Sequence, residues 1–263
     1  MKIYQVSDCH LYLDEAQPRD NLIRALALIE LQGDGDILLL TGDLVCDPNI
    51  EIYTQFKAIV QAHSSIDRIF AIAGNHDDLT MMKSVFKGSR VQVKSHVHLG
   101  DDLSLCFVDS SPKPLAHMSL GAGRVARKAL SSLKQFTRKY RSIVVIHHPV
   151  VNLGAKWFTQ IGIENNLDVV AAIHPQTLAI LSGHAHAFFK DNLTSPQGKI
   201  IPLIVSPATS YGFEHSNPDY EKNTNIGIMA YDIRLDIGSQ SPTKSCKSKP
   251  NYLIHESVIN LSH

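Results

Sequence analysis

Six short apolar runs recur within the first 186 residues, and each ends in small and polar side chains. Between them, apolar residues repeat with helical spacing in four segments. Short buried strands that alternate with helices are typical of an α/β sheet with parallel strands. The predicted strands are Lys2–Val6, Asp36–Leu40, Arg68–Ala73, Leu103–Val108, Ser142–Ile146 and Leu178–Leu181, and the predicted helices are Arg19–Leu31, Ile50–Ala62, Ala126–Phe136 and Val169–Ile173.

The pattern changes near residue 187, where turn-rich sequence begins to separate the apolar runs. Ile200–Val205, Gly227–Leu235 and Asn251–Ile259 are predicted as strands, and we expect them to pair antiparallel. Ser239–Pro250, rich in Ser, Lys and Pro, is predicted to be a flexible loop. With no internal repeat, the 263 residues fit a single domain, 1–263, whose C-terminal third from about 187 is rich in strands.

Charge, hydropathy and cysteine content indicate which binding partners and which cellular location to expect. Lys plus Arg and Asp plus Glu number 25 each, so no net field attracts nucleic acid or an anionic membrane, and we expect neither as a partner. No apolar run approaches the roughly 20 residues that span a bilayer. The four cysteines show no C-x-x-C spacing, and the N-terminal residues read as a strand and not as a signal peptide. We therefore expect free thiols and a cytoplasmic location.

Side chains that can carry chemistry gather where the predicted strands end. The carboxyl ends of strands in open α/β sheets meet at one edge, so residues far apart in the chain are expected to converge there. Each residue alone is also compatible with a turn or a helix cap. Together, two carboxylates, one amide and several imidazoles exceed one tetrahedral site and favour two metal ions that share a carboxylate. The set is Asp8, His10, Asp43, Asn75, His76, His147, His184 and His186.

Five motifs in a fixed order carry a family resemblance. They are Asp8-x-His10, Gly42-Asp43, Gly74-Asn75-His76-Asp77, His147-His148-Pro149 and Gly183-His184-x-His186. Each motif alone is weak evidence, but the full series, with every motif after a predicted buried strand, resembles the calcineurin-like metallophosphoesterase superfamily. The resemblance extends from residue 1 to about 235. It implies an α/β fold, namely a four-layer α/β/β/α sandwich with two mixed β-sheets.

The resemblance also implies a role for each motif residue. His76 would not bind metal; with Asn75 it would contact the substrate phosphate, and it would protonate the leaving alkoxide while Asp77 orients its ring. Two ions of Fe, Mn or Zn are the implied cofactors, because two cations lower the pKa of a shared water and neutralise the phosphate. The implied ligands are Asp8, His10 and His186 for the first ion, Asn75, His147 and His184 for the second, and Asp43 as the bridge.

His148 adjoins His147 in the fourth motif but is not expected to bind metal. Side chains alternate across a strand, so neighbouring residues point to opposite sides. We therefore predict a structural or substrate-lining role for His148.

Segments outside the motifs bear on the substrate. Leu153–Asn165, His174–Gln176 and Ser206–Phe213 resemble the bacterial class III cyclic AMP phosphodiesterases. That resemblance implies hydrolysis of 3′,5′-cyclic nucleotides, with cyclic AMP favoured, to 5′-monophosphates by hydroxide attack, and a homodimer as a common assembly. Glycerophosphodiesters or other small diesters are an alternative substrate class, and phosphomonoesters a further one. A non-catalytic scaffold of the same fold is an alternative of another class, but the complete ligand set and His76 argue against it.

Overall fold

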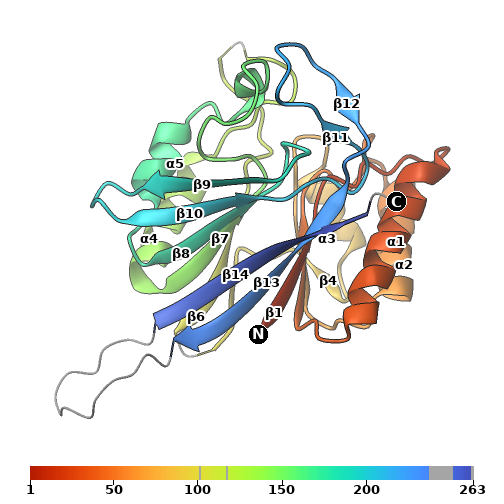
Figure 1. Cartoon of the computed structure of the whole chain (residues 1–263), viewed down its shortest axis with the longest axis horizontal. Coiled ribbons are helices and arrows are strands. Elements are labelled where there is room, and N and C mark those ends of the chain that lie inside the picture. The colour runs from red at the N-terminus through yellow and green to blue at the C-terminus, as the bar shows by residue number, and fades with distance from the viewer. Residues whose placement is uncertain (101, 117, 237–250, 262–263) are drawn as a thin grey trace.

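Two β-sheets lie face to face, and helices cover their outer surfaces (Figure 1). The computed structural model describes residues 1–100, 102–116, 118–236 and 251–261. The loop predicted at Ser239–Pro250 lies outside the described residues. Among the described helices, none has the length and apolar character needed to span a membrane. These helices are α1 Ala16–Gln32, α2 Ile50–His63, α3 Leu79–Val85, α4 Arg127–Lys139 and α5 Asn166–Ala172, with a 3-10 helix, η1, at Phe158–Ile161.

The first sheet has the strand order β14-β13-β1-β2-β3-β4. Strands β1 to β4 run parallel, whereas β13 pairs antiparallel with both β1 and β14. Ile3 of β1 lies opposite both Ile37 of β2 and Tyr231 of β13, so the first strand is central in the sheet. The bounds are β1 Lys2–Val6, β2 Ile37–Thr41, β3 Ile69–Ile72, β4 Val91–Gln92, β13 Gly227–Asp236 and β14 Asn251–Asn260.

The second sheet has the order β5-β6-β7-β8-β10-β9, with antiparallel pairing only at the two edge strands. The prediction of antiparallel strands after residue 187 is therefore confirmed for β13 and β14, and for β10 it is confirmed on the side of β9 but wrong on the side of β8. The β9–β10 hairpin follows β8 and places β10 beside it in parallel. The bounds are β5 His96–His98, β6 Leu103–Val108, β7 Arg141–Ile146, β8 Thr177–Ser182, β9 Phe189–Thr194 and β10 Ile200–Val205, and the small third sheet pairs β11 Gly212–Phe213 with β12 Lys222–Asn223.

Neighbouring residues of each strand enter different apolar layers. Leu39 of β2 lies in the layer between the two sheets, whereas Leu38 packs in the layer beneath α1 and α2. In the second sheet, Val145 lies between the sheets and Val144 packs in the layer beneath α4 and α5. Each fully buried side chain of this kind contributes about 1.5–3 kcal/mol. The predicted four-layer α/β/β/α sandwich with two mixed sheets is confirmed.

Helix caps fix the chain just after two of the strand-end loops. Asn49 Oδ1 accepts a hydrogen bond of 3.0 Å from the amide of Ile52 at the start of α2. Asp78 Oδ1 accepts bonds of 2.8 and 2.9 Å from the amides of Thr80 and Met81 at the start of α3. A side-chain cap stabilises a helix end by about 1 kcal/mol. The two caps anchor the far ends of the loops that follow β2 and β3.

Candidate metal centre

Five loops meet at the carboxyl ends of β1, β2 and β3 in the first sheet and of β7 and β8 in the second. They carry every residue that the motifs predict to bind metal. Backbone hydrogen bonds connect them: the amide of Asp8 donates to the carbonyl of Gly42 at 3.0 Å, and that of His10 to Asp43 at 2.9 Å. The candidate site therefore lies across the ends of both sheets, and its loops hold one another in place.

Non-glycine residues with a left-handed backbone are concentrated in these loops. Among the described residues, only five non-glycine residues have a positive φ, between 45° and 68°. This conformation costs a non-glycine residue on the order of 1–3 kcal/mol and is found mainly where function requires it. All five are predicted metal ligands, so the loops are shaped to aim these side chains at some cost in stability. They are Asp8, His10, Asp43, His184 and His186.

Two motif glycines provide space for carboxylates. A Cβ atom on Gly74 would lie 2.1 Å from Asp43 Oδ1, and one on Gly183 would lie 2.0 Å from Ser7 Oγ and 2.7 Å from Asp8 Oδ2. These separations are far shorter than van der Waals contact. Only glycine allows the backbone to approach the two carboxylates so closely.

Asp8, His10 and His186 form the first group of candidate ligands. His186 Nε2 lies 3.3 Å from Asp8 Oδ1 and 3.1 Å from His10 Nε2. None of the three side chains is more than 3% exposed. Two imidazole nitrogens that face each other beside a carboxylate are positioned to donate their lone pairs to one cation.

Asp43 connects this group to a second one. Its Oδ2 lies 3.5 Å from His10 Nε2 and also 3.5 Å from His147 Nε2. His147 Nε2 lies 3.3 Å from Asn75 Oδ1. The other carboxylate oxygen, Oδ1, accepts a hydrogen bond of 2.9 Å from the amide of His76. An oxygen between two imidazoles of different groups is in the position that a bridging ligand needs.

Backbone carbonyls hold three of the imidazole rings. In each ring one N–H donates to a carbonyl oxygen at 2.8 or 2.9 Å, which turns the other nitrogen toward the site. Such partners fix the orientation of histidines that bind metals. The pairs are His147 Nδ1 with Thr41, His186 Nδ1 with Tyr211, and His184 Nε2 with Ile161.

Burial and charge determine the protonation states of these groups. Burial raises the pKa of Asp43, but His147 and then His10 outweigh it, and the pKa lies well below its usual value. Burial lowers the pKa of His10 to about 3 and holds that of His184 well below its usual value. Burial also lowers the pKa of His147, yet Asp43 raises it to about 9. At pH 7 the carboxylate is ionised and His10 and His184 are neutral, as cation binding requires, whereas a cation must displace a proton from His147.

The donor set fits transition metal ions. The candidate ligand atoms of Asp8, His10 and His186 all lie within 4.8 Å of one another, and so do those of Asp8, Asp43 and His147. Carboxylate oxygens and imidazole nitrogens suit Mn, Fe and Zn ions. The structure therefore brings the predicted ligands together, while the division of ligands between two ions stays a prediction.

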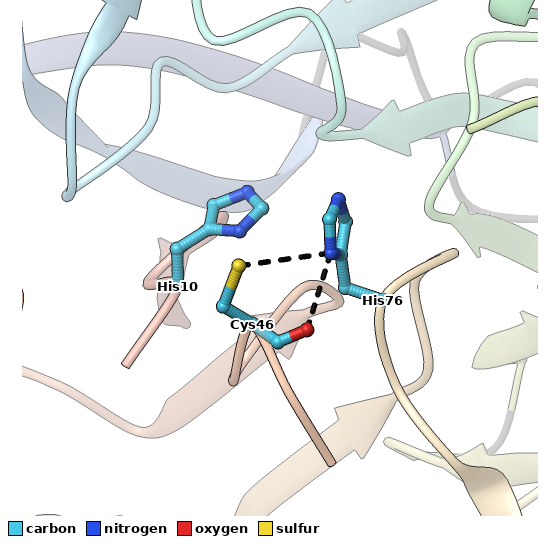
Figure 2. Close-up of side chains that lie close together, drawn as sticks. All are labelled: His10, Cys46 and His76. Atoms are coloured by element: carbon cyan, nitrogen blue, oxygen red, sulfur yellow. Dashed lines mark hydrogen bonds between the residues drawn. The ribbon is translucent and has the colours of Figure 1, made fainter. Parts of the chain in front are cut away.

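His76 lies at the solvent-exposed edge of the site. Its ring meets the His10 ring edge-on, with 4.8 Å between the ring centroids. His76 Nδ1 lies 3.3 Å from the carbonyl oxygen of Cys46 and 3.8 Å from Cys46 Sγ (Figure 2). The hydrogen bond with Cys46 comes first among the causes that raise the pKa of His76 to about 9, followed by burial, which lowers it, and by Asp43, which raises it.

The described residues do not show the expected contact between Asp77 and the His76 ring. The Asp77 carboxylate accepts hydrogen bonds of 2.9 Å from the Tyr53 hydroxyl and from the amide of Gly74, and one of 3.2 Å from the amide of Leu44. These donors occupy both carboxylate oxygens of Asp77. Asp77 thus joins the loops after β2 and β3, and the prediction that it orients His76 is wrong.

His148 is completely buried beside the site. Its Nδ1 accepts a hydrogen bond of 2.8 Å from the Ser110 hydroxyl, and its Nε2–H donates to the carbonyl of Gly121 at 3.0 Å. Burial lowers the pKa of His148 to about 3, so the ring is neutral. Both ring nitrogens are therefore engaged in hydrogen bonds. Of the two roles predicted for His148, structural or substrate-lining, this geometry agrees with the structural one.

An aromatic ring and a cation near the site were not predicted from the sequence. The Tyr211 ring stacks on His10 with 5.5 Å between centroids and an angle of 28°, and its centroid lies 4.6 Å from that of His186. Lys222 Nζ lies 3.7 Å from the Tyr211 ring centroid. Lys222 belongs to β12, a two-residue strand that is too short to produce a periodic signal.

Comparison with known proteins identifies the family of the chain. The family model for calcineurin-like phosphoesterases matches residues 1–188. The chain therefore belongs to the calcineurin-like phosphoesterase family. This confirms the resemblance seen in the five motifs, and it confirms the prediction of an enzyme class that hydrolyses phosphoesters with the help of metal ions.

Two curated relatives carry names that describe a substrate. The chain is 26% identical over 226 residues to the 3′,5′-cyclic adenosine monophosphate phosphodiesterase CpdA of Haemophilus influenzae, covering 81% of this chain and 78% of that protein. It is also 26% identical over 230 residues to the protein of the same name from Pseudomonas aeruginosa, covering 83% and 79%. Among solved structures, a dimetal phosphatase from Danio rerio is similar in fold, with a TM-score of 0.59, 13% identity and coverage of 87% of this chain and 94% of that one.

Proposed function

We propose that this chain is a binuclear metal-dependent phosphodiesterase that hydrolyses 3′,5′-cyclic nucleotides, with cyclic AMP preferred, to 5′-monophosphates. The observation that carries the proposal is Asp43 Oδ2, which lies 3.5 Å from an imidazole of each ligand group. The cyclic nucleotide comes from the names of the relatives, each of which aligns with about four fifths of this chain.

The chain contributes a preorganised set of ligands. Asp8, His10 and His186 would hold one ion, Asn75, His147 and His184 would hold the other, and Asp43 would contribute to both. When bound, the two ions supply a nucleophile at neutral pH and neutralise charge on the phosphate. The buried ligands are held by backbone carbonyls and amides, so little reorganisation is needed when cations bind.

His76 is placed to act as the general acid. Its Nδ1–H donates to the carbonyl of Cys46, which leaves Nε2 on the opposite side of the ring, away from Cys46 (Figure 2). A pKa of about 9 keeps the ring protonated at neutral pH, the form that can give a proton to the departing 3′ oxygen. Lys222, held over Tyr211, adds a positive charge near the site for an anionic substrate.

The test is turnover by protein reconstituted with Mn²⁺. Cyclic AMP and cyclic GMP are compared with glycerophosphocholine, bis(p-nitrophenyl) phosphate and p-nitrophenyl phosphate. We expect the highest kcat/KM for cyclic AMP, with 5′-AMP as product. His76→Ala should lower kcat by about 10²-fold or more and leave metal content unchanged. His63→Ala, which changes an exposed histidine at the end of α2, is the matched control and should keep full activity.

Each of the other possible outcomes would identify which part of the proposal is wrong. Cleavage of bis(p-nitrophenyl) phosphate without cleavage of cyclic nucleotides would agree with the proposed metal centre but would indicate that the substrate is another diester. Preference for p-nitrophenyl phosphate would indicate that the enzyme is a monoesterase and not a diesterase. Absence of bound metal after reconstitution would contradict the enzyme and favour a scaffold.

Three broader expectations belong to the same proposal. We propose that the two sheets form one domain, because they share the apolar layer that includes Leu39 and Val145. We propose a cytoplasmic location, with which the free thiols of Cys9, Cys46 and Cys106 agree. We also propose a homodimer, which sedimentation analysis of the purified chain would test.

A further inference from the structure

A thiol lies between two of the site histidines. Cys46 follows Asp43 in the loop after β2, and its sulfur lies beside the rings of His10 and His76 (Figure 2). The candidate ligand atoms of His10, Cys46 and His76 all lie within 4.8 Å of one another. His10 is buried, Cys46 is half-buried and His76 is exposed, so a cation could reach this cluster from solvent.

We infer that Cys46 and His76, with His10 beside them, form a further cation site that selects a thiophilic divalent ion of the Zn²⁺ type. Thiolate ligands select soft and borderline ions, whereas the carboxylate-rich group around Asp43 accepts harder ones such as Mn²⁺. The site differs from the proposed two-metal centre in its ligand chemistry and its position at the exposed edge. Cation binding here does not rest on the proposed phosphodiesterase activity.

The separation of the two main ligand atoms fits a shared ion. Bonds of about 2.3 Å from Zn²⁺ to sulfur and about 2.05 Å to nitrogen, at a tetrahedral angle, place sulfur and nitrogen about 3.6 Å apart. Cys46 Sγ and His76 Nδ1 are 3.8 Å apart. A shift of a few tenths of an ångström is therefore enough for both to bind one ion, and a side-chain adjustment at the exposed His76 can supply it.

Two neighbouring atoms support the same assignment. His10 Nδ1 is buried and has no hydrogen-bond partner among the described residues, which is costly for a polar atom. Because His10 Nε2 faces the metal centre, Nδ1 carries the proton, and a sulfur that has lost its own proton beside the ring offers this N–H an acceptor. The Tyr12 hydroxyl lies 2.6 Å from Cys46 Sγ and accepts the hydrogen bond of the thiol. When the thiol loses its proton to a cation, the same hydroxyl can rotate and donate to the sulfur, as outer partners of metal ligands do.

Occupation of this site would change the state of His76. A cation on Nδ1 replaces the hydrogen bond from His76 to the carbonyl of Cys46. It also competes for the ring that the proposed mechanism uses as its acid. A thiophilic ion would therefore act as an inhibitor that binds at the edge of the centre.

The test is a Cd²⁺ titration of the full chain already loaded with Mn²⁺, with Cd²⁺ as a probe for thiophilic ions. Ultraviolet absorption from cadmium–thiolate charge transfer reports sulfur coordination, and elemental analysis reports bound Cd²⁺ and retained Mn²⁺. We expect the wild-type chain to develop the thiolate band with one more Cd²⁺ bound than in Cys46→Ser. The band should be absent in Cys46→Ser and Cys46→Ala, which are checked for native far-ultraviolet circular dichroism.

The controls separate this site from other sulfur atoms and from the proposed activity. Cys246→Ser should retain the band, and the buried thiols of Cys9 and Cys106 are inaccessible in the folded chain. A band that persists in Cys46→Ser, or no band in the wild type, would overturn the inference. The band does not require catalysis, so an inactive chain that still shows it would contradict the proposed function and leave this site intact.

Discussion

The layer between the two sheets and the loops at the ends of the same strands differ in almost every physical respect. Leu39 and Val145 occupy a layer of buried apolar side chains, while Asp43 and His147, a few residues further along, are buried charged or polar groups. The layer stabilises the fold by ordinary burial. The loops contain all five left-handed non-glycine residues among those described, together with close backbone approaches. The comparison teaches that this fold uses a stable interior to hold a strained and polar end in place.

The largest expected effect tests the centre of the polar end. Asp43→Ala removes the oxygen that lies 3.5 Å from both His10 and His147. Metal content should fall from about two ions per chain toward none, and turnover should fall by more than about 10⁴-fold, beyond the effect of a lost general acid. Elemental analysis and turnover measure this, with Asp191→Ala on the exposed edge strand as control. Full metal content in Asp43→Ala would refute the bridging role.

A smaller effect tests whether close backbone approach matters. In Gly74→Ala, the new Cβ would lie 2.1 Å from Asp43 Oδ1 and must displace the carboxylate. We expect metal affinity to weaken by about 10–100-fold, the range found for residues that orient ligands. Gly100→Ala is the matched control, because no atom of the described part of the chain lies within 4 Å of its added Cβ. Metal affinity is measured by competition with a chelating dye. Equal affinities in the two variants would contradict the idea that the close approach of the Gly74 backbone to Asp43 matters for metal binding.

A substitution in the apolar interior should lower the stability of the chain and leave metal binding unchanged, which is the opposite of what we expect at the polar end. Leu39→Ala opens a cavity between the sheets and is expected to lower the free energy of unfolding by about 2–5 kcal/mol. Metal content and KM of the folded fraction should stay unchanged. The exposed Leu31 provides the control, since Leu31→Ala should change stability by less than about 0.5 kcal/mol. Denaturant unfolding measures both variants, and a loss of metal by folded Leu39→Ala would show that the two regions are coupled.

The smallest expected effect compares a thiol of the polar end with Cys106, which lies in the apolar layer beneath α4 and α5. Burial raises the pKa of Cys106 to about 12, so this thiol stays protonated at pH 8, and raising the pH from 7 to 9 should not make it reactive. Cys46 is half-buried at the polar end. Iodoacetamide followed by peptide mass mapping should find Cys46 labelled and Cys106 unlabelled in the native chain, with both labelled after unfolding. Labelling of native Cys106 would indicate that the interior opens.

The sequence predicts the interior and the convergence of the ligands well, for a physical reason. A strand such as Leu103–Val108 is found where a continuous apolar run indicates it, because burial on both faces leaves a clear composition. The ends of parallel strands must meet, so the gathering of Asp8, Asp43 and His147 follows from topology. Their local signal is strong because each motif lies next to its strand.

What the sequence does not reveal depends on contacts between loops. The partner of the His76 ring is Cys46, which comes from the loop after another strand, whereas Asp77, adjacent in sequence, turns to Tyr53. Adjacency in the chain therefore suggested the wrong partner. Lys222 lies on a two-residue strand without periodicity, and its approach to Tyr211 depends on how a surface hairpin folds back. Cys46 had one usable signal, its place three residues after Asp43 within a ligand loop.

The central position of β1 has a consequence for the order in which the chain can assemble. This strand leads into Asp8 and His10, yet its antiparallel neighbour pairs Lys2 with Asp232. Synthesis proceeds from the N-terminus, so the first strand leaves the ribosome long before its partner exists. Pairing across such a sequence separation also slows folding. A nascent chain that lacks β13 therefore exposes one side of β1 to solvent or chaperones, and cations supplied during synthesis would meet a completed centre only near the end of translation.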